Sequence, residues 1–159
     1  MTTRTLNLDD EADTCALAAH LASRVQAGSV ITLRGPLAAG KTSFARGFLR
    51  GLGFTGTVKS PTFTLVETYR VADFTVHHFD LYRLVDPGEL YYLGFDEYLL
   101  PGTIALIEWP ERGGEFVPIP DLEITLEVLS ATQRHARLIA ATFRGEALIE
   151  ELGDSKKFS

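Results

Sequence analysis

The chain has 159 residues, of which 45% are hydrophobic and 23% are charged, and its formal net charge at pH 7 is −6. These values are ordinary for one globular domain with a sizeable core, so we treat residues 1–159 as a single domain. The charge argues against an extended basic surface that grips nucleic acid unaided, so we expect RNA contact mainly through a partner protein. No apolar run approaches the roughly 18 residues of a membrane span, and no membrane contact is expected.

Two further features predict a cytoplasmic protein. Residues 1–11 lack the apolar core of a secretion signal. The one cysteine, Cys15, cannot form an internal disulfide and lies in a helical pattern, which predicts a buried structural thiol. A reducing compartment fits both features. The short tail at 156–159 is predicted to be a solvated terminus.

The first predicted elements are a helix and a buried strand. Residues 9–26 show helical periodicity after an acidic start, with Leu17, Leu21 and Val25 on one face. Residues 29–34 are apolar and β-branched, which predicts a strand. A second helix is expected at 43–52, where proline is absent and one face is apolar.

The strand at 29–34 runs directly into the pattern G-x-x-x-x-G-K-T at residues 35–42. In such a loop several backbone N–H groups converge on phosphate oxygens, and the tight curl requires small residues where the backbone approaches the ligand. Lys41 places a charge between the β- and γ-phosphates, and the Thr42 hydroxyl can bind Mg²⁺. The following helix also directs its positive end at the phosphates. The residues predicted to bind the nucleotide here are Gly35, Pro36, Leu37, Ala38, Ala39, Gly40, Lys41 and Thr42.

The next segment, residues 58–69, resembles the switch segment of other phosphate-loop proteins. The β-branched and aromatic residues after Pro61 predict a strand. Thr62 follows Thr42 by 20 residues, and a hydroxyl at such a place can contact the metal or the γ-phosphate. Ser60 is the rival hydroxyl, and a turn fixed by Pro61 is the structural alternative.

Two predicted strands end in acidic residues. The strand at 74–79 is followed by Asp80, and the strand at 104–107 by Glu108. Ligands of α/β sheets bind at the carboxyl ends of the strands, so both acids should lie near Lys41 and Thr42. A triphosphate site needs one carboxylate for Mg²⁺ and often a second group that orients water. We assign Glu108 to the metal and Asp80 to the water. The reverse assignment stays open, as does a helix cap or surface acid for either residue.

The remaining acids and aromatic residues have structural interpretations as well. Asp86 and Glu89 form a capping box at a helix start. The adjacent residues His77 and His78 should point to opposite faces of a strand, which argues against joint metal binding. Trp109 follows Glu108 and could line the site or pack in the core.

The C-terminal part predicts a β-hairpin from the alternating stretches 121–129 and 134–143, followed by a short helix at 145–152. Strands separated by helical segments predict an α/β fold: a three-layer sandwich like that of P-loop nucleoside triphosphatases, with a central mixed, mainly parallel sheet. Asn7 is the only asparagine, so the Asn-Lys-x-Asp guanine-binding motif familiar from GTPases cannot be present, and ATP is favoured over GTP.

Four blocks, in this order and spacing, resemble the bacterial TsaE family, and the resemblance covers about residues 5–145. The blocks are Gly-Pro-Leu-Ala-Ala-Gly-Lys-Thr from position 35, Lys-Ser-Pro-Thr-Phe-Thr-Leu-Val from 59, His-Phe-Asp-Leu-Tyr-Arg-Leu from 78 and Ile-Glu-Trp-Pro-Glu from 107. The resemblance implies a small P-loop ATPase that supports threonylcarbamoyladenosine modification of tRNA. It further implies that the protein binds a TsaD–TsaB type complex and uses ATP turnover to reset it.

The resemblance also implies roles for single residues. Lys41 and Thr42 carry over as phosphate and Mg²⁺ ligands, Glu108 as the metal acid and Asp80 as essential for hydrolysis, so Lys41, Asp80 and Glu108 are the expected catalytic residues. The further residues expected at the nucleotide are Thr62, as a switch hydroxyl, and Thr14 and Arg134.

One departure from the family concerns the phosphate loop. The family usually reads Gly-Asp-Leu-Gly-Ala-Gly-Lys-Thr, whereas this chain has Pro36 and Ala38. If position 38 needs a positive φ, alanine there costs about 1 kcal/mol of local strain.

The leading hypothesis is an ATPase that is weak alone and depends on partners. A non-hydrolysing nucleotide-dependent docking module is the first alternative. A small-molecule kinase is the second, with Arg112 as the candidate lid residue.

Overall fold

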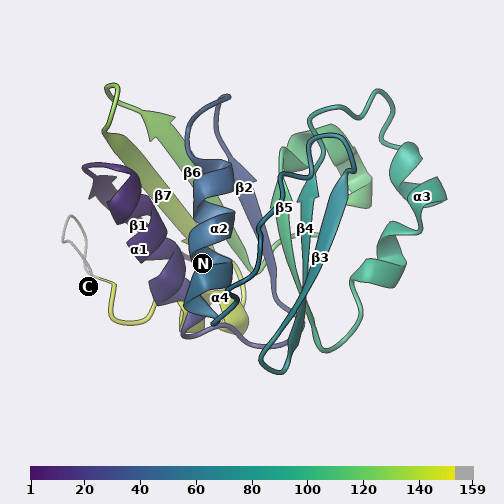
Figure 1. Ribbon diagram of the computed structural model, residues 1–159, viewed down its shortest axis with the longest axis horizontal. Helices are drawn as coiled ribbons and strands as arrows, with labels where there is room; N and C mark the ends of the chain where they lie inside the picture. Colours follow the sequence, from purple (N-terminus) through teal and green to yellow (C-terminus); the bar gives the residue numbers. More distant parts are fainter. Residues whose placement is uncertain (153–159) are drawn as a thin grey trace.

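The computed structural model describes residues 1–152, which form one sheet of seven strands flanked by helices (Figure 1). The predicted solvated tail at 156–159 therefore lies outside the described residues. The strands are β1 (Thr2–Leu8), β2 (Val30–Arg34), β3 (Val66–Val71), β4 (Phe74–Asp80), β5 (Thr103–Glu108), β6 (Leu122–Val128) and β7 (Arg134–Ala140). The helices are α1 (Glu11–Ala22), α2 (Lys41–Gly51), α3 (Glu89–Leu93) and α4 (Phe143–Leu148), with 3₁₀ segments η1 (Phe95–Tyr98) and η2 (Pro110–Phe116).

The strand order β1-β7-β6-β2-β5-β4-β3 confirms the predicted α/β class and the mixed sheet. The neighbours β6, β2, β5 and β4 are parallel, whereas β7 pairs antiparallel with both β6 and β1, and β3 pairs antiparallel with β4. The pairing of β6 with β7 is the predicted C-terminal hairpin. The central strand β2 has β5 on one side and β6 on the other, so the strand order reverses at β2. The loop that follows β2 therefore lies at the switch point where ligands of such sheets bind.

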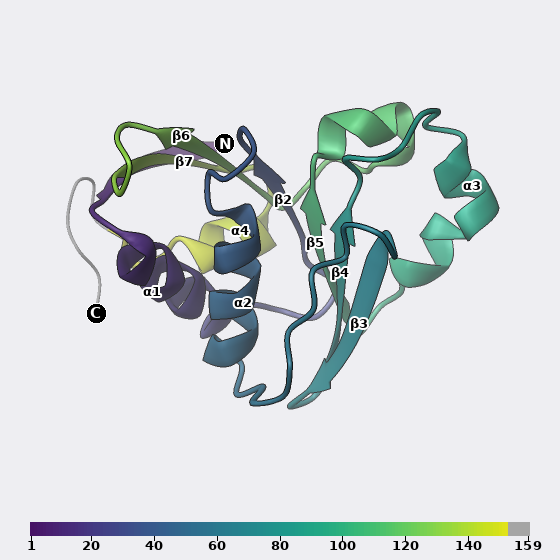
Figure 2. The same cartoon turned by 45° about the horizontal axis from the view of Figure 1, so that its top comes forward.

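Helical segments cover both faces of the sheet, as Figure 2 shows. The larger core lies under α1, α2 and α4 and includes Leu17, Phe44 and Leu148. The smaller core lies on the opposite face, where α3 and η1 cover β4 and β5 through Leu90 and Phe95. Alternation along β4 and β5 therefore directs one set of side chains toward α2 and the other toward α3.

The sequence prediction missed β1, which forms an edge of the sheet beside β7. Leu6 and Leu8 are buried in the larger core, whereas Thr3 and Asn7 are exposed. The alternation is visible in the sequence, but the segment is short and polar, and its strand character depends on pairing with residues about 130 positions away.

The strand predicted after Pro61 is wrong in its first half, because β3 begins only at Val66. Residues 61–65 form turns instead. The amide of Leu65 donates to the carbonyl of Pro61 at 2.8 Å, and Leu65 has a φ of 73°. A local hydrogen bond and a left-handed residue thus replace the extended conformation that the β-branched side chains indicated.

Helix bounds also differ from the predicted ranges. The first helix ends at Ala22 and not near residue 26, and the C-terminal helix spans Phe143–Leu148 and not 145–152. The predicted capping box is only half formed. Glu89 accepts a hydrogen bond from the amide of Asp86, but the Asp86 carboxylate accepts from the amide of Gly88, and Gly88 is the N-cap of the five-residue α3. Cys15 is half-buried at the contact between α1 and α2, less buried than predicted.

Candidate functional site

The site begins at the loop between β2 and α2, whose backbone requires left-handed residues. Gly35 has a φ of 147°, and a Cβ there would lie 2.6 Å from the carbonyl oxygen of Leu126, so only glycine fits. Gly40 has a φ of 106° and precedes the first residue of α2. Ala38 has a φ of 63°, the conformation that costs strain for a residue with a Cβ. Ala38, which stands where the family usually has glycine, therefore has a strained backbone conformation in this loop.

Arg134, at the start of β7, holds this loop from the side. Its guanidinium donates to the carbonyl of Ala39 at 3.0 Å and to the carbonyl of Ala38 at 3.1 Å. Thr14 of α1 is buried, and its methyl carbon would lie 3.9 Å from a Cβ on Gly40. Thr14 and Arg134 both line a cavity of about 250 Å³ on this flank of the loop. The structure thus brings both residues to the loop at which the resemblance implies that the nucleotide binds.

Lys41 is buried although it carries a charge. Its ammonium donates to the carbonyl oxygens of Gly35 at 2.5 Å and Pro36 at 2.8 Å, and it lies 4.3 Å from the centre of the Trp109 ring. Burial lowers the pKa of Lys41, and the carboxylates of Glu108, Asp80 and Glu111 oppose this effect. The ammonium is therefore held at the loop by carbonyl oxygens and an aromatic face.

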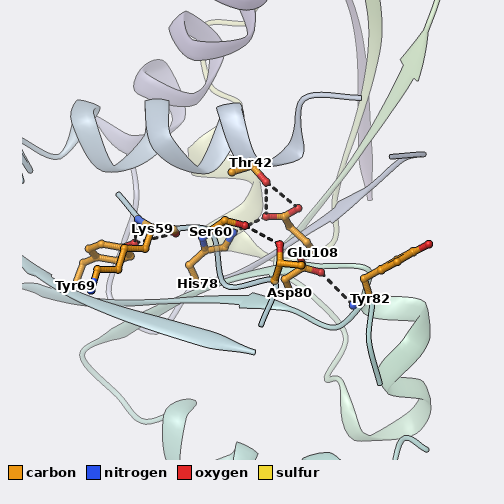
Figure 3. Close-up of polar contacts among 9 residues, drawn as sticks. Thr42, Lys59, Ser60, Tyr69, His78, Asp80, Tyr82 and Glu108 are labelled. Carbon is orange, nitrogen blue, oxygen red and sulfur yellow. Dashed lines mark hydrogen bonds and ion pairs between the residues drawn. The ribbon is translucent and has the colours of Figure 1, made fainter. Parts of the chain in front are cut away.

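Glu108, the last residue of β5, is almost fully buried and faces α2 (Figure 3). Its Oε2 lies 2.6 Å from Nε2 of His78 on β4. The hydroxyl of Thr42, in the first turn of α2, lies 3.3 Å from Oε2 and 3.5 Å from Oε1. Glu108 therefore joins the sheet to the helix that follows the phosphate loop.

Asp80, the last residue of β4, lies directly beside Glu108, because the two are register partners in the parallel pair. Its Oδ1 accepts a hydrogen bond from the backbone amide of Tyr82 at 3.1 Å. Burial raises the pKa of Asp80; the Tyr82 amide opposes this shift, and the charge of Glu108 adds to it. A carboxyl group with a raised pKa next to a charged neighbour is typical of functional sites.

These groups surround one cavity of about 430 Å³. Thr62 contributes to its wall, while Ser60 does not line it and reaches Thr62 through a 2.7 Å contact between the two hydroxyls. Trp109 lines the cavity and also packs against the smaller core, so it has both of the positions that the sequence allowed, in the site wall and against the core. The lining residues are Leu37, Ala38, Gly40, Lys41, Thr42, Ser43, Thr62, Asp80, Tyr82, Arg83, Glu108 and Trp109.

Sequence reasoning missed one residue with a direct contact to the acids, which is His78. The prediction that His77 and His78 point to opposite faces is confirmed, since His78 contacts Glu108 whereas His77 contacts Thr68 at 2.8 Å. A signal was available: His78 shares its strand face with Asp80 two residues later. The guanidinium of Arg112, the candidate lid residue, lies 5.1 Å from the centre of the Tyr82 ring and 5.7 Å from that of Trp109.

The donor set fits Mg²⁺ better than a softer metal. The groups that meet are a hydroxyl and a carboxylate, and oxygen ligands suit this ion. Within residues 1–152 no group of three or more His, Cys, Asp or Glu side chains is arranged to hold a metal by itself. Mg²⁺ is usually held by one or two protein groups together with phosphate oxygens, so two ligands such as Thr42 and Glu108 would be enough to hold it.

The fold and the site together define an α/β protein of the P-loop class. A parallel central strand leads through a glycine-bounded loop into a helix, and acidic residues end the strands beside it. The family model described as "Threonylcarbamoyl adenosine biosynthesis protein TsaE" matches residues 8–137. The chain belongs to the TsaE family.

Curated relatives support the assignment over most of the chain. A Haemophilus influenzae protein named tRNA threonylcarbamoyladenosine biosynthesis protein TsaE is 44% identical over 120 residues, covering 76% of this chain and 75% of the relative. Proteins of the same name from Rickettsia felis and Bacillus subtilis are 39% and 38% identical, covering 97% and 94% of this chain and 90% and 91% of theirs.

A solved structure has the same fold. The crystal structure of Bacillus subtilis YdiB superposes with a TM-score of 0.81 at 32% sequence identity, covering 95% of this chain and 94% of that chain. Among residues 1–152, no helix has both the length and the apolar character to span a bilayer.

Proposed function

We propose that this protein binds and hydrolyses ATP and that it serves threonylcarbamoyladenosine modification of tRNA in the cytoplasm. The observation that carries the proposal is the convergence of Lys41, Thr42, Asp80 and Glu108 on one cavity beside the loop. These residues come from three separate segments of the chain. Acids that served only as helix caps or surface groups would not be expected to line one cavity together with Lys41 and Thr42.

Each side chain has a distinct task in this proposal. The loop amides and the Lys41 ammonium bind the phosphates, and Lys41 can leave the carbonyls of Gly35 and Pro36 for phosphate oxygens, which are stronger acceptors. Thr42 and Glu108 hold Mg²⁺, which when bound neutralises charge on the β- and γ-phosphates. Asp80 orients the attacking water and accepts its proton, a task that its raised pKa suits. Thr14 and Arg134 flank the nucleotide, and Thr62 offers a hydroxyl from the cavity wall.

ATP turnover serves a partner complex of the TsaD–TsaB type, which the protein resets between modification cycles. Membership of the TsaE family supports the pathway. The net charge of −6 supports indirect contact with tRNA through that complex, because phosphate binding needs basic surface.

The test is ATP hydrolysis measured for the protein alone and with a purified TsaD–TsaB complex. We expect slow turnover alone and stimulation by the complex. Absence of both hydrolysis and ATP-dependent association would contradict the proposal. Association without hydrolysis, together with modification activity that survives Asp80→Ala, would identify a nucleotide-dependent docking module instead. A phosphorylated acceptor detected by mass spectrometry would identify a kinase.

A further inference from the structure

The contact between His78 and Glu108 is the shortest that either acid of the site makes with a side chain. The distance from Nε2 to Oε2 is 2.6 Å, whereas the Thr42 hydroxyl lies 3.3 and 3.5 Å from the same carboxylate. Both His78 and Glu108 are almost fully buried. Because a long contact restrains a side chain weakly, His78 is the partner that determines where the Glu108 carboxylate points.

The other ring nitrogen of His78 identifies the tautomer. Nδ1 is buried and has no hydrogen-bond partner within residues 1–152. A proton on Nδ1 alone would leave a buried N–H group unsatisfied and would give the Glu108 carboxylate no donor at Nε2. The contact therefore assigns the donating N–H to Nε2, with Oε2 of Glu108 as its acceptor.

We infer that His78 is a positioning residue that holds the Glu108 carboxylate beside Thr42 for Mg²⁺. The inference rests on the proposed function, because it concerns the same metal site. The groups behind metal ligands commonly change metal affinity by about 10- to 100-fold when they are removed. Figure 3 shows His78 on the sheet side of Glu108 and Thr42 on its helix side.

The neighbouring residue His77 provides a matched control on the same strand. It points to the opposite face, where its Nδ1 lies 2.8 Å from the Thr68 hydroxyl and its ring packs edge-on against Tyr98. Replacement of His77 therefore removes a buried imidazole and its hydrogen bond without touching Glu108.

The experiment compares His78→Leu, His78→Gln and His78→Asn with His77→Gln. Calorimetry with a non-hydrolysable ATP analogue at a series of Mg²⁺ concentrations gives the Mg²⁺ midpoint, and thermal unfolding without nucleotide or metal reports stability separately. We expect His78→Leu to raise the Mg²⁺ midpoint about 10-fold or more. His78→Gln should return it to within about 3-fold of the wild type, because its amide nitrogen can replace Nε2, whereas the shorter His78→Asn should not. His77→Gln should leave the midpoint unchanged.

An unchanged Mg²⁺ midpoint in His78→Leu would overturn the inference, whether or not the melting temperature falls. If His78→Leu does not fold, equal midpoints in His78→Gln and His78→Asn would overturn it as well. A wild-type protein that binds the analogue without any dependence on Mg²⁺ would instead reject the proposed metal site, and with it this role for His78.

Discussion

The ends of β5 and β4 carry the two acids of the site in different environments. Glu108 contacts two side chains, His78 and Thr42, and these link the sheet to α2. Asp80 is the register partner of Glu108 on the neighbouring strand. Within residues 1–152 its carboxylate accepts one hydrogen bond, from the backbone amide of Tyr82, and burial raises its pKa. Glu108 is held by two side chains, whereas Asp80 is held by one backbone amide and its pKa is raised by burial.

This difference shows how one pattern, an acid at a strand end, can serve two tasks. A metal ligand benefits from fixed orientation, which Glu108 obtains from His78. A group that accepts a proton from water benefits from a raised pKa, and burial raises the pKa of Asp80. The comparison supports the assignment of Glu108 to Mg²⁺ and Asp80 to water, and the following predictions test it.

The largest effect is expected from Lys41→Ala, because both acids matter only if the loop holds a triphosphate. Loss of the ammonium removes the charge that meets the β- and γ-phosphates, so we expect ATP affinity to fall by about 100-fold or more, measured by calorimetry. Lys59→Ala is the control, since Lys59 is exposed. Unaltered affinity in Lys41→Ala would show that the loop does not cradle phosphate, and the comparison of the acids would lose its meaning.

Replacing each acid by its amide should affect different quantities, the rate of hydrolysis for Asp80 and the Mg²⁺ midpoint for Glu108. Asp80→Asn is expected to lower the rate of hydrolysis about 100-fold while ATP affinity and the Mg²⁺ midpoint stay near wild-type values. Glu108→Gln is expected to raise the Mg²⁺ midpoint by about 10-fold or more. Single-turnover hydrolysis and Mg²⁺ titrations measure the two quantities. The reverse pattern would exchange the two assignments.

A smaller effect concerns the stability of Asp80→Asn as pH changes. A carboxyl whose pKa is raised by folding favours the folded state at a pH below its unfolded pKa, and this contribution is lost as pH rises through the folded pKa. The amide variant lacks this loss and keeps an oxygen for the Tyr82 amide. We therefore expect Asp80→Asn to melt at a higher temperature than the wild type at pH 7 to 8, with the difference shrinking as pH falls toward about 4. Calorimetric scans across this range provide the check.

The control for this pH series is Asp73→Asn, which changes an exposed acid in the turn between β3 and β4. It should show no such difference. A melting temperature of Asp80→Asn that follows the wild type at every pH would mean that burial does not penalise the Asp80 carboxylate.

The smallest effect is expected from Ala38→Gly in the phosphate loop. Ala38 has a φ of 63°, so glycine removes strain of about 1 kcal/mol, partly offset by the greater freedom of glycine in the unfolded chain. We expect a rise in melting temperature of about 1 to 3 °C. Ala39→Gly, in the same loop, is the comparison, and equal behaviour of the two variants would contradict the strain at position 38.

Much of the site could be predicted because its signals are local. The strand that enters the loop, the positions of Gly35 and Gly40 and the acids after two apolar strands all depend on neighbours within a few residues. The hairpin of β6 and β7 was recognisable for the same reason, since two alternating segments are joined by a short turn.

The sequence by itself determined the α/β class, the phosphate loop and the list of acids, because periodicity and spacing along the chain encode them. Only the tertiary structure decided that β1 completes the sheet beside β7, that residues 61–65 turn before β3 begins, and that His78 holds Glu108. The physical reason is common to β1 and to His78: each acquires its role from a partner about 30 to 130 residues away, and no local pattern records which distant group will lie within hydrogen-bond distance.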